Sequence, residues 1–328
     1  MLLRVIDLLV CLCACLLPIC RGQEEACDGD SDTCRYADPD KVAEVVCDDD
    51  HPSCSEWARL GECDANPVYM EMSCAKSCAT CHMKDPATRC MVTKKQIPTV
   101  LRGDMDLLFN RIVEEFQEFN VTVISRSPWL VALDGFISEE EALALQSGGH
   151  DADFAFEAST GGTPLDELDT TTTLGRNSST AWCAQQKCLD NPHIDAVAAR
   201  MTHLTTAPKG NFEFLQILRY RETERYGMHH DYLPDQLFKP SGPRVLTVSL
   251  YLNDVEEGGE THFRDLGVSV SPKLGRALVW PSVLVSDPTA PDMRTVHEAL
   301  AVKRGVKYVV NAWVHLFDFK GWHAKGCV

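Results

Sequence analysis

Residues 307–317 read KYVVNAWVHLF. β-Branched and aromatic residues dominate this run, which is typical of a buried β-strand. Three earlier runs have the same character: FEFLQILRY (212–220), RVLTVSLYLN (244–253) and RALVW (276–280). Glycine, proline and acidic turns separate the runs, as they separate the short strands of an antiparallel sheet. One position is out of character, because Lys307 places a charge on a mostly apolar strand.

Helical patterns precede these strands. Apolar residues recur on one side of residues 104–119, Ser138 and the glutamates after it form a capping box, and Asn191-Pro192 is a typical helix start. Helices followed by short strands predict an α+β domain built on an antiparallel sheet or barrel. We place this domain at residues 128–318, between a helical linker region at 82–127 and a C-terminal tail at 319–328.

The bulk composition limits the class of partner. The chain has 328 residues and a formal net charge of −17. This length suffices for one large domain and a smaller module. The acidic charge excludes nucleic acid as the partner, because phosphates require a basic surface. It is compatible with a basic polypeptide, and the sequence itself assigns no partner subunit.

The first 22 residues have the form of a secretory signal peptide. Arg4 precedes an apolar run at 8–17, which Pro18 ends, and small residues near Gly22 offer a cleavage point. The run is shorter than the ~20 residues that a membrane span needs, so we expect membrane association only if the segment stays uncleaved. The polar, acidic residues 23–46 are expected to form a linker.

Cysteine usage agrees with a secretory location. The sequence has 16 cysteines, and four of them leave with the signal peptide: Cys11, Cys13, Cys15 and Cys20. An even number then remains, which predicts disulfides in an oxidising compartment, either the endoplasmic reticulum or Golgi lumen or the outside of the cell. The sequon at Asn120 predicts glycosylation in the same compartment.

Three groups of cysteines lie outside the densest stretch. Cys27 and Cys34 are expected to close a small loop. Cys183 and Cys188 are close enough in sequence to pair. The partners of Cys90 and Cys327 stay open.

Residues 47–81 contain six cysteines, too many for a module held by an apolar core alone. Spacing by itself allows 15 connectivities. The spacing, with Asp49, Trp57 and Gly61, resembles the ShKT domain, and this resemblance implies three pairs: Cys47–Cys81, Cys54–Cys74 and Cys63–Cys78. The positions of the channel-blocking dyad hold Val68 and Tyr69 here, so we expect an accessory or substrate-docking module and no channel block.

The stretch MHHDY at 228–232 raises the question of a metal site. On an extended segment, residues i and i+2 point to one face, so His229 and Asp231 can converge while His230 turns away. One imidazole and one carboxylate are two-thirds of the 2-His-1-carboxylate triad of Fe(II) oxygenases. His297 is the candidate for the second histidine. Lys307, ten residues later, could pair with the distal carboxylate of a dicarboxylic acid.

These residues and their neighbours resemble the prolyl 4-hydroxylase family of Fe(II)- and 2-oxoglutarate-dependent dioxygenases. The resemblance covers roughly residues 128–318. It rests on five motifs: Tyr220-x5-Tyr226-x2-His229-x-Asp231, Arg244-x2-Thr247-x3-Tyr251-Leu252-Asn253, Gly258-Gly259-Glu260-Thr261-x-Phe263, Pro272-x2-Gly275-x-Ala277, and His297 with Lys307 and Trp313. The resemblance implies a double-stranded β-helix, or jelly roll, flanked by helices.

The resemblance also implies the roles of single residues. His229, Asp231 and His297 would ligate Fe(II), and Lys307 would bind the C5 carboxylate of 2-oxoglutarate. Two more residues would line the same pocket: Tyr220 and Thr247. Substrate contacts are expected from the family's Arg-x-Ser stretch and from residues near the iron: Arg176, Trp182, Tyr226, Trp313 and His315. A second sequon begins at Asn177, but a glycan there would obstruct this groove.

The implied reaction is hydroxylation of peptidyl proline at C4. 2-Oxoglutarate would be converted to succinate and CO2, and L-ascorbate would rescue oxidised iron. The substrate would be a proline-rich or collagen-like polypeptide. Two alternatives stay open: a related oxygenase acting on lysine or another residue, and an inert oxygenase domain in an extracellular ShKT binding protein.

Two positions depart from the family pattern, at sites that bind no ligand. Thr223 stands where the family often has glycine, which adopts positive φ freely. Ala301 stands where the family often has proline. We expect these departures to affect loop geometry and substrate range more than activity.

Overall fold

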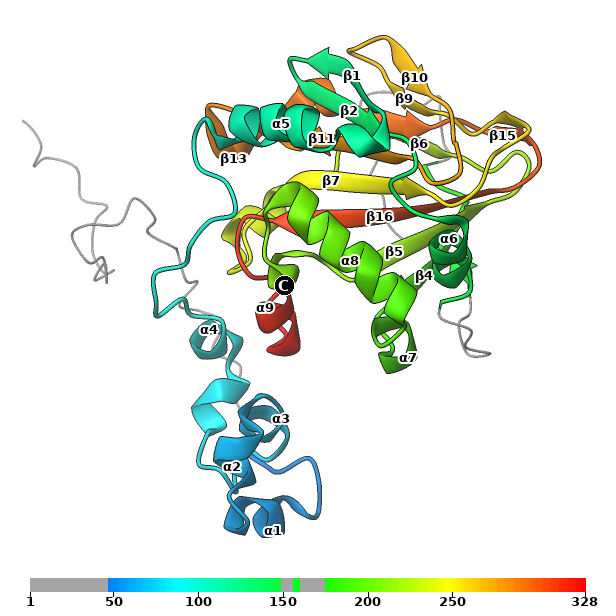
Figure 1. Ribbon diagram of the computed structural model, residues 1–328. Coiled ribbons are helices and arrows are strands. Elements are labelled where there is room, and N and C mark those ends of the chain that lie inside the picture. The colour runs from blue at the N-terminus through cyan, green and yellow to red at the C-terminus, as the bar shows by residue number, and fades with distance from the viewer. Residues whose placement is uncertain (1–46, 149–155, 160–174) are drawn as a thin grey trace, which may run out of the picture. The chain divides into compact units, whose positions relative to one another are not determined.

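The computed structural model of the protein describes residues 47–148, 156–159 and 175–328 (Figure 1). The expected signal peptide, the acidic linker and the cysteines at 27 and 34 lie outside the described residues. Within the described ranges, no helix is both long enough and apolar enough to cross a membrane.

Two antiparallel sheets form the larger domain. In the described residues, one sheet has eight strands in the order β1-β2-β11-β7-β16-β5-β4-β3, and the other has four in the order β10-β9-β14-β6. The eight strands are β1 Val121–Arg126, β2 Trp129–Leu133, β3 Glu157–Ala158, β4 Ser179–Cys183, β5 Leu215–Tyr220, β7 Arg244–Tyr251, β11 Ala277–Pro281 and β16 Lys307–His315. The four are β6 Tyr226–His229, β9 Thr261–Phe263, β10 Val268–Val270 and β14 His297–Ala299.

Shorter pairs and helices complete the chain. Two strand pairs lie apart from both sheets: β12 Val283–Leu284 with β13 Asp287–Pro291, and β15 Val302–Arg304 with β8 Glu257–Gly258. The described α-helices are α1 Cys54–Arg59, α2 Glu62–Ala65, α3 Pro67–Ser73, α4 Pro86–Arg89, α5 Asp104–Glu115, α6 Glu139–Gln146, α7 Gln186–Leu189, α8 Pro192–Thr205 and α9 Lys320–Ala324. The 3-10 turns are η1 Cys81–Lys84, η2 Gln117–Phe119, η3 Lys209–Asn211, η4 Pro234–Phe238 and η5 Met293–Thr295.

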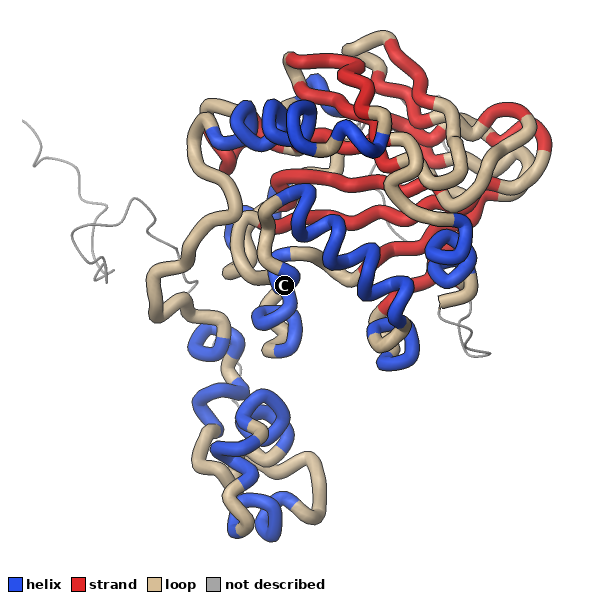
Figure 2. Tube along the Cα trace, viewed as in Figure 1, coloured by secondary structure: helices blue, strands red, loops and turns tan. Residues whose placement is uncertain are grey.

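Each side of the large sheet has its own apolar core. One core joins the sheet to α5, α6 and α8, which lie along its outer face (Figures 1 and 2). The other lies between the sheets, where Leu218, Tyr251 and Trp280 of the large sheet meet Phe263 of the small one. Because successive side chains of a strand point to opposite faces, the large sheet contributes residues to both cores, as in a sheet covered on two sides. The predicted α+β jelly roll is confirmed.

The expected domain boundary at residue 128 has to be corrected. Strand β1 pairs with β2 from Val121 to Arg126, and the buried side of α5 belongs to the outer core. A boundary at 128 would separate paired strands and expose that side of the helix. The domain therefore begins at about α5. The helix starts at Ser138 and Asn191 are confirmed, the first with a complete capping box and the second with an Asn191 cap.

The C-terminal tail is fastened to the segment that follows the small module. Cys90 and Cys327 form a disulfide, and the Arg89 guanidinium donates to the Lys325 carbonyl at 2.7 Å. The Trp322 indole donates to Gln96 at 3.0 Å. This disulfide supplies the pairing that spacing left open.

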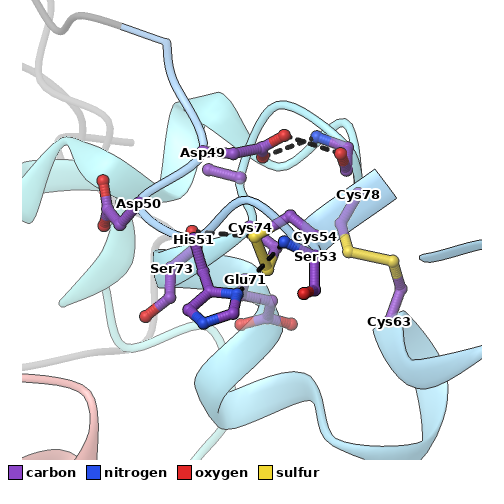
Figure 3. The surroundings of a disulfide bond; sticks show 12 residues. Asp49, Asp50, His51, Ser53, Cys54, Cys63, Glu71, Ser73, Cys74 and Cys78 are labelled. Atoms are coloured by element: carbon purple, nitrogen blue, oxygen red, sulfur yellow. Dashed lines mark hydrogen bonds between the residues drawn. A yellow bond between two sulfur atoms is a disulfide. The ribbon is translucent and has the colours of Figure 1, made fainter. Parts of the chain in front are cut away.

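Disulfides build the small module at 47–81. The three predicted pairs are present, and so is Cys183–Cys188 in the larger domain. The core of the module contains Cys54, Met70 and Cys74. Asp49 accepts two hydrogen bonds from Ser77, at 2.9 Å from the amide and 2.6 Å from the hydroxyl, and Figure 3 marks them as dashed lines at Asp49.

The turn between β5 and β6 stores backbone strain at Thr223. This residue has φ of 70°, and its amide donates to the Val302 carbonyl at 2.7 Å. A β-branched residue is disfavoured in this left-handed region, which glycine adopts without steric cost.

We expect Thr223→Gly to raise the free energy of unfolding by about 1 kcal/mol, because it relieves this strain. Thr223→Ala is the matched control, since it keeps a Cβ and with it most of the strain. Thermal unfolding measures both variants. Equal melting temperatures for the glycine and alanine variants would contradict the prediction.

Candidate metal centre

His229, Asp231 and His297 come together in the small sheet. β14 lies beside β6 with His297 directly opposite His229, and Asp231 follows the end of β6. One donor atom from each residue lies within 4.8 Å of the others, and no other group of this kind occurs among the described residues. His229 Nε2 is 4.0 Å from Asp231 Oδ1, and His297 Nε2 is 3.8 Å from Asp231 Oδ2. The three residues form a facial donor set of two imidazoles and one carboxylate.

The other nitrogen of each imidazole is held by a backbone carbonyl. His229 Nδ1 lies 2.9 Å from the Gly227 carbonyl, and His297 Nδ1 lies 3.0 Å from the Thr295 carbonyl. A carbonyl only accepts, so each Nδ1 carries the proton. Each Nε2 therefore presents a lone pair towards Asp231, as a metal ligand must.

The charge states suit a divalent cation. Burial, together with the neighbouring His297, lowers the pKa of His229 to about 3, so its imidazole is neutral at pH 7. Burial opposes ionisation of Asp231, but the two histidines and a hydrogen bond from Thr247 lower its pKa to about 2. The site therefore offers a neutral His229 imidazole and the Asp231 anion, and together with the His297 imidazole these donors fit Fe(II).

Thr247 contacts the carboxylate. Its hydroxyl donates to Asp231 Oδ2 at 2.7 Å, and its side chain is fully buried. Because this bond occupies the ligand oxygen that faces β7, Thr247 orients Asp231. In this structure the Thr247 hydroxyl supports Asp231, and its expected place in the cosubstrate pocket stays a prediction.

Lys307 is a buried cation without an ion-pair partner among the described residues. Its side chain is 1% exposed, and its Nζ lies 5.3 Å from the ring centre of Tyr220 and 5.4 Å from that of Tyr251. Tyr220 is its direct neighbour across β5 and β16. Burial lowers the pKa of Lys307 to about 7. Such a group is costly unless an anion joins it, so the surroundings of Lys307 suit the carboxylate of a diacid.

Arg176, Tyr226 and His229 form a stack beside the metal ligands. The Arg176 guanidinium lies 4.6 Å from the Tyr226 ring centre, and that ring stacks on His229 at 3.7 Å. Arg176 also donates to Ser178 at 2.9 Å. Two expected substrate residues are thus brought to the metal site.

Trp182, Trp313 and His315 lie further along the large sheet. Trp182 is 41% exposed and its ring centre is 6.3 Å from that of Trp313. His315 is fully buried, with one ring nitrogen 2.7 Å from the Gly242 carbonyl and the other 2.7 Å from Glu213. Both nitrogens of His315 are occupied, so it contributes here through Glu213 and leaves no nitrogen free for a substrate.

Two residues that sequence reasoning did not assign to the site join this cluster. Arg244 forms a two-pronged ion pair with Glu213, at 2.5 and 3.0 Å, and covers the Trp313 ring at 3.7 Å. Two buried side-chain atoms, Trp313 Nε1 and Gln216 Oε1, have no hydrogen-bond partner among the described residues. Glu213 could have been found from the sequence, because it is a charged residue within the apolar run FEFLQILRY. The same kind of signal identified Lys307 within its own strand.

His230 points to the opposite side of the strand, as alternation predicts. Its imidazole contacts a second segment, which contains Asp292 and Thr295. Its Nδ1 accepts the Tyr232 amide at 2.9 Å, so the proton sits on Nε2, which donates to the Asp292 carbonyl at 3.0 Å. Thr295 Oγ1 lies 3.1 Å from the same nitrogen. The Thr295 carbonyl in turn anchors His297, so His230 links the two segments that supply the metal ligands.

We expect His230→Asn and His230→Gln to differ in divalent-metal affinity. Asparagine can still accept the Tyr232 amide but cannot reach Asp292, whereas glutamine can reach Asp292. Loss of a supporting contact costs about tenfold in metal affinity, so the asparagine variant should bind Co(II) about tenfold more weakly and the glutamine variant nearly as well as the native protein. Calorimetric titration with Co(II) measures this, and equal weakening in both variants would contradict the link.

Comparison with known proteins identifies both parts of the chain. The 2OG-Fe(II) oxygenase superfamily matches residues 215–315, and the ShK domain-like family matches residues 46–81. Prolyl 4-hydroxylase 1 of Arabidopsis thaliana is 30% identical over 211 residues, which cover 58% of this chain and 70% of that protein. Prolyl 4-hydroxylase 2 of the same plant is 30% identical over 166 residues, which cover 44% and 54%.

Two more relatives show how much of each chain the similarity covers. Prolyl 4-hydroxylase subunit alpha-2 of Gallus gallus is 34% identical over 143 residues, covering 43% of this chain and 26% of that protein. The chain therefore spans only about half, or a quarter, of some of the relatives that it matches. A viral collagen prolyl hydroxylase from Paramecium Bursaria Chlorella virus-1 is 25% identical, with a TM-score of 0.44, over 57% of this chain and 95% of its own.

Proposed function

Because the chain belongs to the prolyl 4-hydroxylase family of 2-oxoglutarate- and Fe(II)-dependent oxygenases, we propose that it hydroxylates peptidyl proline at C4. The observation that carries this proposal is the pairing of two features: an open triad of His229, Asp231 and His297, and the buried, unpaired Lys307. A triad alone suits many metals and reactions. The added cation selects a diacid cosubstrate, which is 2-oxoglutarate in this family.

The residues of the chain would hold the reactants in place. Fe(II), once bound with 2-oxoglutarate, supplies the oxygen chemistry, and the protein supplies orientation and a dry cavity. His229 and His297 offer their Nε2 atoms, and Asp231, held by Thr247, offers the anion. Lys307 binds the far carboxylate of the diacid, with the Tyr220 ring beside it. Succinate, CO2 and hydroxylated peptide are the products.

Flat side chains beside the triad and along the large sheet would receive a peptide substrate. A proline-rich chain in the polyproline II form has no internal hydrogen bonds, so its carbonyls are free to accept. The exposed Trp182 ring, with Arg176 and Tyr226, gives flat surfaces on which proline rings can pack.

A secretory location completes the proposal. Five disulfides in the described residues suit an oxidising compartment, and the Asn120 sequon is exposed at the end of η2. We therefore assign the enzyme to the lumen of the endoplasmic reticulum or Golgi, or to secretion, with glycosylation at Asn120. L-Ascorbate would return oxidised iron to Fe(II) between turnovers.

The test uses the purified, oxidised protein with Fe(II), 2-oxoglutarate, ascorbate and a panel of proline-rich and lysine-rich peptides. We expect proline peptides to gain one oxygen atom and to stimulate succinate release. Peptides in which alanine replaces proline are the control. Oxygen gain on lysine peptides alone would assign the enzyme to the lysine alternative, and no gain on any peptide would favour an inert domain.

A further inference from the structure

The small disulfide module presents three aromatic rings in contact. His51 stacks on Trp57 at 4.4 Å between ring centres, and Tyr69 meets Trp57 edge to face at 6.1 Å. His51 is exposed and Tyr69 is 42% exposed, while Trp57 is partly buried. We call these three residues the ring cluster. The metal centre and the core of the larger domain use none of them.

Contacts with the core of the module hold the ring cluster in place. Trp57 packs against Cys54, Met70 and Cys74, and the disulfide of the first and third residues fixes that core. His51 Nδ1 accepts the Ser53 amide at 3.1 Å, which orients the imidazole (Figure 3). Rings that are already ordered lose little conformational entropy when a partner binds. This arrangement suits recognition, because a core needs no exposed imidazole and phenol.

The module also carries an excess of negative charge. Residues 47–81 contain seven acidic residues and two basic ones, so their formal sum is −5 (2 − 7). Asp48 pairs with Lys76, Asp49 is held by Ser77, and Asp50 pairs with Lys84. The side chains of the other four form no hydrogen bond or ion pair with described residues: Glu56, Glu62, Asp64 and Glu71. They remain available to a basic partner.

We propose that the ring cluster docks a second segment of the same substrate polypeptide, a basic, proline-rich stretch in the polyproline II form. This inference rests on the proposed function, which makes such a polypeptide the substrate. Polyproline II segments dock on exposed aromatic side chains because they are already extended and lose little entropy. Lysines between the prolines would reach the unpaired carboxylates. A basic polypeptide also matches the net charge of −17 of the whole chain.

A short covalent route ties the docking site to the catalytic domain. Cys81 closes the module, and nine residues later Cys90 is joined to Cys327. Nine residues span at most about 30 Å. A repetitive substrate bound at the ring cluster would therefore be presented to the active site at an effective concentration in the millimolar range. Long repeats should gain from this effect, and short peptides should not.

The test compares substrate length in ring-cluster variants of the full chain. The double variant His51→Ala/Tyr69→Ala removes the two exposed rings and leaves Trp57 in place. Leu60→Ala is the control, because Leu60 is 61% exposed in the same module but belongs to no ring contact. The substrates are a peptide of many lysine- and proline-containing repeats and a peptide with a single proline site. Intact-mass analysis verifies that all disulfides persist.

We expect the double variant to raise KM for the long peptide about tenfold, with kcat unchanged. KM for the short peptide should not change, and the Leu60 control should match the native protein with both. Added salt should weaken binding of the long peptide to the native protein. An unchanged KM for the long peptide in the double variant, or an equal rise in the Leu60 control, would overturn the proposal.

A second readout separates this proposal from the proposed function. Fluorescence anisotropy of the labelled long peptide measures binding without turnover. Ring-dependent binding with no hydroxylation of any peptide would support docking while the proposed reaction fails. If both peptides are hydroxylated but the long peptide binds equally well to the native protein and the double variant, the docking proposal is overturned. The proposed reaction is then still supported.

Discussion

His297→Ala should abolish stoichiometric binding of divalent metal and lower kcat by at least about a thousandfold, which corresponds to about 4 kcal/mol. The variant removes one of three donors from a site in which each imidazole is fixed by its own carbonyl. His229 and Asp231 alone leave the cation with too few protein ligands. Calorimetric titration with Co(II) and a succinate assay measure the two effects.

His262→Ala is the matched control for that experiment. His262 lies on β9, the strand beside His297, but its ring nitrogen pairs with Ser269 at 2.9 Å, away from the triad. Metal binding and turnover should persist in this variant. If His297→Ala bound Co(II) as tightly as the His262 variant, the assignment of the triad would be contradicted.

Lys307→Met should raise the dissociation constant of 2-oxoglutarate about a hundredfold or more, about 3 kcal/mol, while metal binding stays intact. Methionine approximates the lysine stem but carries no charge. The ligand-free protein should be at least as stable as the native one, because a buried ammonium without a partner is costly. Lys303→Met is the control, since Lys303 is an exposed lysine on β15 that pairs with Glu257. Unaltered affinity for 2-oxoglutarate in Lys307→Met would contradict the assigned pocket.

The same lysine predicts a pH dependence of cosubstrate binding. Its pKa is about 7 in the free protein, below the ordinary 10.5, because burial disfavours the ammonium. A bound carboxylate favours the charged form and raises that pKa, so binding above pH 7 takes up a proton. Affinity for 2-oxoglutarate should therefore fall as pH rises from 7 to 9. Calorimetry in buffers of different ionisation enthalpy measures the proton uptake, which should be absent in Lys307→Met.

Local patterns predicted the metal centre because strand geometry depends on near neighbours. Alternation alone places His229 and Asp231 together and turns His230 away, and the charge of Lys307 stands out within an apolar strand. The structure confirms that the His229, Asp231 and His297 donors converge, and Lys307 is buried as that pattern implied.

Contacts between distant segments were beyond this kind of reasoning. His230 hydrogen-bonds to Asp292, which is 62 positions away in the sequence, and Cys90 forms a disulfide with Cys327, which is 237 positions away. Glu213 and Arg244 meet only because β5 and β7 both flank β16. The start of the domain was misplaced for the same reason, since the partner of β1 is the strand on the other side of the supposed boundary.

The most direct test of the central claim is the fate of the oxygen atom. The oxidised protein, incubated with Fe(II), 2-oxoglutarate, ascorbate and a proline-rich peptide, should yield 4-hydroxyproline and one succinate for each hydroxyl formed. Mass spectrometry of peptide fragments locates the added oxygen. An oxygen on lysine with proline untouched, or succinate release that no proline peptide stimulates, would contradict the account.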